Sequence, residues 1–110
     1  MTETEQLSLT EENAFNLSQV AIQLDQARED STQLATALER NMEVWVAMRI
    51  MVSRAGEALQ QDTKDNLIRL SQFVAETTMK YGADIPGEVI DTLININLQI
   101  SEGFLESAKA

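Results

Sequence analysis

The stretch that decides the fold is residues 38–51, "LERNMEVWVAMRIM". Together with its flanks, it places apolar side chains at steps of three and four residues, the spacing of one face of an α-helix. Between Val44 and Val52 only Arg49 is polar, so we expect a long central second helix, residues 32–55, that is surrounded on most sides. The positions that share its main face are Leu34, Leu38, Asn41, Trp45, Met48, Val52, Ala55 and Leu59.

Three further segments of the chain repeat this helical spacing. A single proline and four glycines in 110 residues leave few other breaks. We therefore expect an all-α fold, a small helical bundle of about four helices, that occupies residues 10–110 as one domain. The three segments run from about Thr10 to Ala27, from residue 63 to about Lys80, and onward from Pro86.

Polar residues mark the ends of these helices. Residues 1–9 are polar and acidic, and we expect them to form a flexible arm. Asp30 or Ser31 can cap the second helix. The alternative that the first and second helices are one continuous helix stays open. Asp62 or Thr63 can cap the third helix.

The last helix carries two apolar stripes. A glycine in mid-helix costs about 1 kcal/mol against alanine, so Gly103 is expected either to permit close packing or to begin the helix end. The first stripe contains Ile90, Leu93, Asn97, Ile100 and Phe104, and the second contains Val89, Ile96 and Gly103.

The charge is uneven along the chain. The formal net charge is −10, with 18 acidic and 8 basic residues. Residues 1–30 and 82–110 hold twelve of the acids and two of the bases, whereas residues 31–81 balance six against six. Acidic ends oppose docking on phosphate backbones or anionic lipid, so we expect neither a nucleic acid nor a membrane as a direct partner.

The chain lacks the side chains that most enzymes and metal sites use. It has no cysteine and no histidine, which removes the usual nucleophile–base pairs and most transition-metal sites. We expect neither an enzyme nor a bound cofactor or metal. The acidic N-terminus lacks the pattern of a secretory signal. No apolar run approaches the ~20 residues of a membrane span. We therefore expect a cytoplasmic protein.

Two asparagines interrupt otherwise apolar faces. Asn41 and Asn97 are interpreted as a structural polar core, since a buried and unpaired amide would cost roughly 1–3 kcal/mol. The alternative is that one of them faces a groove and bonds a partner's backbone. Trp45 is expected to anchor the core, with its indole N–H bonded to an acceptor such as an asparagine.

Methionines suggest a surface for another helix. Met42, Met48, Met51 and Met79 can simply fill core gaps, but flexible thioethers also line grooves that accept a partner's amphipathic helix. We expect residues 42–51 and 93–104 to form such a groove or its support. The candidate partner-binding residues are Met42, Trp45, Val46, Arg49, Leu93, Asn97, Ile100 and Phe104.

Three segments in order resemble one protein family. "LERNMEVWVAM" is similar to the family's asparagine followed by a leucine/valine–tryptophan pair, and "DNLIRLSQFV" to its apolar series that ends in an aromatic–valine pair. "LININLQISEGF" is similar to its terminal signature of isoleucine, asparagine and glycine followed by leucine. The family is that of the flagellar biosynthesis regulator FlaF. The resemblance covers about residues 34–106; the chain departs from it by lacking a proline in "EALQQDT" and by carrying Phe104 where leucine is usual.

The resemblance implies a small helical protein needed for flagellin production and export. In this interpretation the protein is a secretion chaperone that binds the terminal helices of flagellin, which are disordered amphipathic segments before assembly. The alternative is a regulator of flagellin expression that acts through the companion protein FlbT without binding flagellin. A third hypothesis is a self-associating bundle; we expect a monomer or a weak homodimer.

Overall fold

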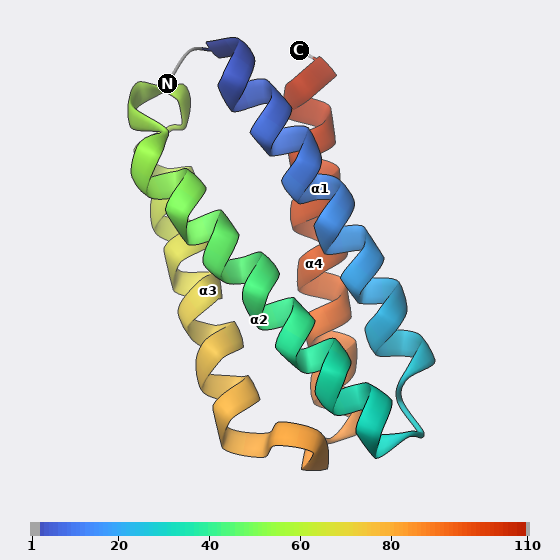
Figure 1. Ribbon diagram of the computed structural model, residues 1–110. Coiled ribbons are helices and arrows are strands. Elements are labelled where there is room, and N and C mark those ends of the chain that lie inside the picture. Colours follow the sequence, from blue (N-terminus) through green and yellow to red (C-terminus); the bar gives the residue numbers. More distant parts are fainter. Residues whose placement is uncertain (1–2, 110) are drawn as a thin grey trace.

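The computed structural model describes the backbone of residues 3–109 and the side chains of residues 10–106. Within this part of the chain there is no strand, and four α-helices form a bundle (Figure 1), which confirms the expected all-α fold. Two short 3-10 turns, η1 and η2, lie on either side of the third helix. The elements are α1 (Glu3–Gln26), α2 (Ser31–Arg54), η1 (Gly56–Ala58), α3 (Gln61–Tyr81), η2 (Gly82–Asp84) and α4 (Gly87–Lys109).

The first two helices are separate: α1 ends at Gln26, and Asp30 caps the start of α2. Its backbone is extended, and its Oδ1 accepts hydrogen bonds from the backbone N–H groups of Thr32 and Gln33 at 3.0 and 3.1 Å. These bonds satisfy N–H groups that have no partner within the first turn of a helix. At the same end of the bundle Gly82 ends α3 with a φ of +54°, a conformation that glycine adopts without steric cost.

Two expected helix starts are wrong. The first helix begins at Glu3 rather than at Thr10, so residues assigned to the acidic arm continue the helix. Of the predicted flexible arm, residues 1–9, the first two residues and the remaining side chains lie outside the described residues. The third helix begins at Gln61, before both predicted caps, and its cap residue Gln60 makes no side-chain capping bond.

The helices alternate in direction along the bundle. The bundle is 42 Å long, and a helix of 24 residues spans about 36 Å, so each helix runs along most of it. Figure 1 shows α1 lying along α4, and α2 lying between α1 and α3. Close backbone packing therefore runs from α4 to α1, then to α2, and then to α3.

The predicted face of α2 is the centre of the core. Seven of its eight positions are buried, and only Leu59, beyond the helix end, is half-buried. The expectation that α2 is surrounded on most sides is wrong, because Val46 and Ile50 are 50% and 47% exposed. A wide apolar arc thus does not mean a wholly covered helix here.

Trp45 is the largest fully buried side chain, with 2% of its surface exposed. Replacing it by alanine is expected to lower the free energy of unfolding by roughly 3–5 kcal/mol, the range for deleting a buried aromatic ring. Urea unfolding followed by circular dichroism measures this loss. The matched control is Val46→Ala on the exposed side of α2, which should stay within about 0.5 kcal/mol of the parent; equal effects of the two changes would contradict the burial of Trp45.

Candidate partner-binding groove

A hollow of about 670 Å³ lies between the start of α3 and the end of α4. Its apolar lining comes from Leu59 and Leu67 on one side and from Ile100 and Phe104 on the other. Polar side chains, among them Asn66, lie at its edges. An apolar floor with polar groups at the edges is typical of protein sites that bind apolar ligands or segments.

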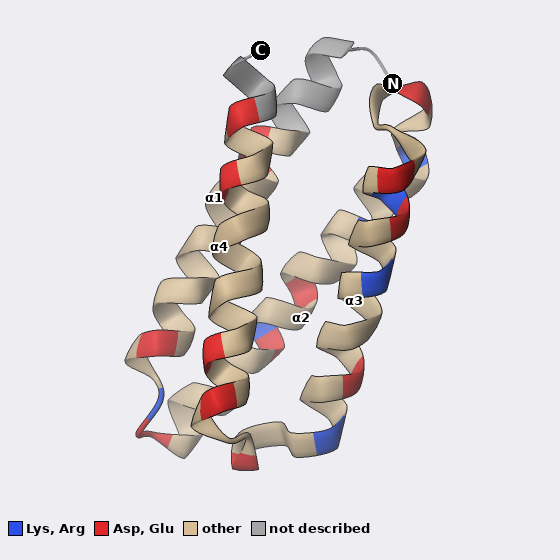
Figure 2. Cartoon of the chain, turned by 180° about the vertical axis from the view of Figure 1, so that it is seen from behind, with Lys and Arg blue, Asp and Glu red and all other residues tan. Residues whose placement is uncertain are grey.

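The hollow exists because α3 and α4 do not close on one another. In Figure 2, α3 and α4 stand at opposite sides of the view, and α2 is visible between them. The close packing of α4 is with α1, whereas that of α3 is with α2 and η2. The fourth side of the bundle is therefore left partly open.

Gly103 leaves the α4 side of this hollow without a side chain at its position. It lines the hollow from α4, and a Cβ atom built there would meet nothing within 4 Å. Neither predicted role of Gly103 holds, because no neighbour packs closely on it and α4 continues to Lys109. What the glycine does instead is to leave space beside Ile100 and Phe104.

The apolar walls continue along the bundle away from this end. On α4, Ile96 and Val89 lie seven and fourteen residues before Gly103, so they share its side of the helix. Both are half-buried. On α3, Phe73 lies seven residues after Asn66 and is 40% exposed. We call this surface, together with the hollow, the α3/α4 groove; its five residues here are Val89, Ile96 and Gly103 on α4 and Asn66 and Phe73 on α3.

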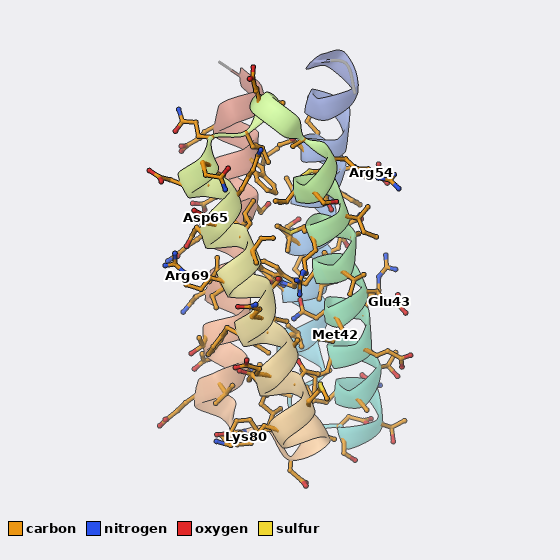
Figure 3. All side chains as sticks on the ribbon, turned by 90° about the vertical axis from the view of Figure 1, so that its left-hand side faces the viewer. Met42, Glu43, Arg54, Asp65, Arg69 and Lys80 are labelled. Carbon is orange, nitrogen blue, oxygen red and sulfur yellow. The ribbon has the colours of Figure 1, made fainter. Side chains whose placement is uncertain are left out.

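Charged groups at the groove are few and of both signs. Asp62 lines the hollow, and Figure 3 shows Arg69 extending from α3 on the side of α4. Within residues 10–106, no group of acidic side chains is arranged to hold a metal ion. The groove is therefore suited to packing against an apolar surface.

A buried hydrogen-bond chain joins α2 to α4 inside the bundle. Trp45 Nε1 donates to Asn97 Oδ1 at 2.9 Å, and Asn97 Nδ2 donates to Asn41 Oδ1 at 2.7 Å. Both amides are fully buried. The acceptor of the Trp45 indole N–H is thus Asn97 on α4. It is not Asn41, which lies one turn from Trp45 on α2.

A family model describes this chain from residue 1 to residue 104 under the name flagellar protein FlaF. The chain belongs to the FlaF family. No curated protein and no solved structure matches it. FlaF is a flagellar protein family and is not known as a family of enzymes. No helix within the described residues is long and apolar enough to cross a membrane.

The residues that carried the resemblance to FlaF have structural positions of two kinds. Asn41, Trp45 and Asn97 form the buried hydrogen-bond chain between α2 and α4. Gly103 and Phe104 line the groove. In this member of the FlaF family the signature residues therefore hold α4 in place and shape the surface beside it.

The structure divides the eight candidate partner-binding residues into three groups. Trp45, Leu93 and Asn97 are buried and support the bundle from inside. Ile100 and Phe104 both line the α3/α4 groove, Ile100 half-buried and Phe104 buried, with 6% of its surface exposed. The other three lie on α2, away from the α4 wall of the groove: Met42 is half-buried on the side facing α3 (Figure 3), and Val46 and Arg49 are exposed.

Sequence reasoning missed the α3 wall of the groove. Leu59, Leu67 and Asn66 were not among the candidates, and Leu59 was expected on the main face of the second helix instead. A signal for the α4 wall was available in the second stripe, Val89, Ile96 and Gly103. Nothing in the sequence indicated that this stripe and the start of α3 would face each other across an open space.

The hydrogen-bond chain predicts unequal effects of its two asparagines. Asn97→Leu leaves both the indole N–H and Asn41 Oδ1 without partners, and should destabilise the protein by roughly 2–4 kcal/mol. Asn41→Leu should cost less, roughly 1–2 kcal/mol. Only Asn97 Nδ2 loses its partner, and the change removes the buried Asn41 Nδ2 group, which donates no hydrogen bond among the described residues.

Urea unfolding of both variants measures the difference. Tryptophan fluorescence gives a second readout, since only Asn97→Leu removes the acceptor of the Trp45 indole. Equal losses of stability, or a larger loss for Asn41→Leu, would contradict the central position of Asn97 in the chain of bonds.

Proposed function

We propose that this member of the FlaF family binds flagellin in the cytoplasm as a secretion chaperone and thereby supports flagellin synthesis and export. The binding surface is the α3/α4 groove, into which a terminal segment of flagellin packs as an amphipathic helix. The single observation that carries the proposal is the open, apolar hollow between α3 and α4 in a protein of a flagellar family.

The shape of the groove supports a helical occupant. An amphipathic helix presents apolar side chains at three- and four-residue steps, and a groove between two helices receives such a row. The wall residues on α4, Val89, Ile96 and Gly103, repeat every two helical turns, so they form a row parallel to the groove. A helix seated there would complete the fourth side of the bundle.

The chemistry of the groove supports a partner that must be kept from associating with itself. Half-buried Ile96 and Ile100 offer apolar contact, and Asn66 at the edge of the hollow offers hydrogen bonds. Covering the apolar face of an unassembled flagellin segment would prevent premature polymerisation. Control of flagellin synthesis then follows from how much flagellin is held in the complex.

Binding is tested by gel filtration of the purified protein with monomeric flagellin. We expect a complex that is lost when the terminal helices of flagellin are deleted. Absence of a complex at roughly tens of micromolar would exclude the proposal. If the protein instead binds FlbT and not flagellin, the alternative of a regulator that acts through FlbT would replace it.

Gly103 gives the sharper test of the site. Gly103→Trp fills the hollow and should weaken flagellin binding by at least about tenfold, the effect of losing a central contact. Gly103→Ala should bind as the parent does and should raise stability by about 1 kcal/mol, since the added methyl group meets no neighbour and alanine favours the helix.

The size of the introduced side chain needs its own control. Val46→Trp adds the same ring to the exposed side of α2, away from the groove, and should leave flagellin binding unchanged. Titration calorimetry compares the three variants. Equal losses in Gly103→Trp and Val46→Trp would contradict the groove as the binding site.

A further inference from the structure

A second apolar surface lies on the opposite side of α4, where α4 packs along α1. Four of the eight exposed large apolar side chains described in the structure belong to these two helices. Phe15 and Ile22 are 61% and 50% exposed on α1, and Leu98 and Leu105 are 39% and 45% exposed on α4. We call these four side chains the outer strip.

A hydrogen bond between the two helices shows how their residues are aligned. Ser101 Oγ donates a hydrogen bond to the carbonyl oxygen of Ala14 at 2.7 Å, so these two residues are level with each other. Phe15 follows Ala14 directly, and Leu98 and Leu105 lie about one turn before and after Ser101. In each helix the two apolar residues are seven apart and share one side.

A shallow hollow adjoins this surface further along the helices. Ile22 and Leu98 line it together with half-buried Ile94, and its volume is about 480 Å³. Since Ile22 and Leu98 line the same hollow, the outer strip extends across both helices. Scattered single apolar side chains are common on protein surfaces, but a connected row is typical of an interaction site.

The charges beside the outer strip are almost all negative. Glu11 lies one turn before Phe15 on α1, and Glu102 lies between Leu98 and Leu105 on α4. No lysine or arginine occurs in residues 10–26 or 87–106. The two helices that carry the strip therefore form the acidic half of the described structure, whereas residues 31–81 hold equal numbers of acids and bases.

Among the described side chains, the basic group that lies at the strip, Arg28, is already paired. Arg28 bonds Asp25 through Nε at 2.9 Å and bonds Asp91 through Nη2. These hydrogen bonds, first that of Asp25, raise the pKa of the Arg28 guanidinium, so it stays charged while it bridges α1 and α4. It neutralises part of the local charge, whereas Glu11 and Glu102 form no ion pair with any basic side chain that the structure describes.

We propose that the outer strip is a second docking site, and that its partner is an amphipathic helix with lysine or arginine residues beside its apolar face. Apolar contact with the four side chains gives affinity, and basic residues complement the acids on both sides of the strip. A second copy of the chain does not fit, because it would bring two acidic surfaces of a protein of net charge −10 together. The proposal concerns a face separate from the flagellin groove and does not depend on it.

The first test uses two synthetic helical peptides with the same leucine face. One carries lysines at the flanking positions, and the other carries glutamates there. We expect the full-length protein to bind the lysine peptide, measured by fluorescence anisotropy, with an affinity that falls as salt rises. Equal affinity for the glutamate peptide would overturn the proposal.

Variants then place the peptide on the protein. Phe15→Ser combined with Leu98→Ser should weaken binding by at least about tenfold, whereas Val46→Ser with Ile50→Ser, a matched exposed pair on α2, should not change it. Glu11→Gln with Glu102→Gln should weaken binding and reduce its salt dependence, whereas Glu39→Gln with Glu57→Gln should not.

Three results would overturn the outer strip as the site. The control pairs could weaken binding as much as the strip pairs, or Gly103→Trp could abolish peptide binding while the strip pairs have no effect. Sedimentation of the protein alone could also show a dimer that Phe15→Ser with Leu98→Ser dissociates, which would identify a second copy as the occupant.

Discussion

The hydrogen-bond chain from Trp45 through Asn97 to Asn41 is the constraint on which the arrangement of the helices depends. It links α2 with α4, two helices whose backbones are not close neighbours, through side chains that are fully buried. A buried amide that loses its partner costs free energy, so any shift of α4 along α2 is penalised. Apolar packing alone tolerates such shifts more easily than these bonds do.

This constraint explains how an open groove can coexist with an ordered bundle. α4 is held by α1 along its length and by the asparagine bonds to α2, while α3 is held by α2 and η2. The space between α3 and α4 is therefore not needed to fix the position of either helix. Gly103 adds no side chain to that space, and half-buried Ile96 and Ile100 remain available to a partner.

The fold was largely predictable because periodicity reports which residues share a face. Leu38, Trp45 and Met48 were assigned to one face of a central helix, and all are buried. The start of α1 was missed because residues 3–9 have little apolar periodicity. The exposure of Val46 and Ile50 was missed for another reason: a broad apolar arc looks the same in the sequence whether or not a neighbouring helix covers it.

The groove was harder to predict for the same physical reason. Ile100 and Phe104 were candidates because they lie on an apolar stripe, but so were Leu93 and Trp45, which are wholly buried. Burial depends on which helices lie beside a stripe, and that depends on long-range contacts such as the bond from Trp45 to Asn97. Sequence spacing therefore indicated α4 as a helix with apolar stripes, without indicating which of its sides lies beside an open space.

α4 is the element that joins the two proposed surfaces, and its geometry keeps them apart. Successive residues of an α-helix are rotated by about 100°, so Ile96 in the groove and Leu98 in the outer strip point in directions about 160° apart. Asn97 lies between them in sequence and points into the bundle, where it is bonded to α2. Two partners could therefore occupy opposite sides of α4 without meeting, while the buried bonds hold the helix between them in one register.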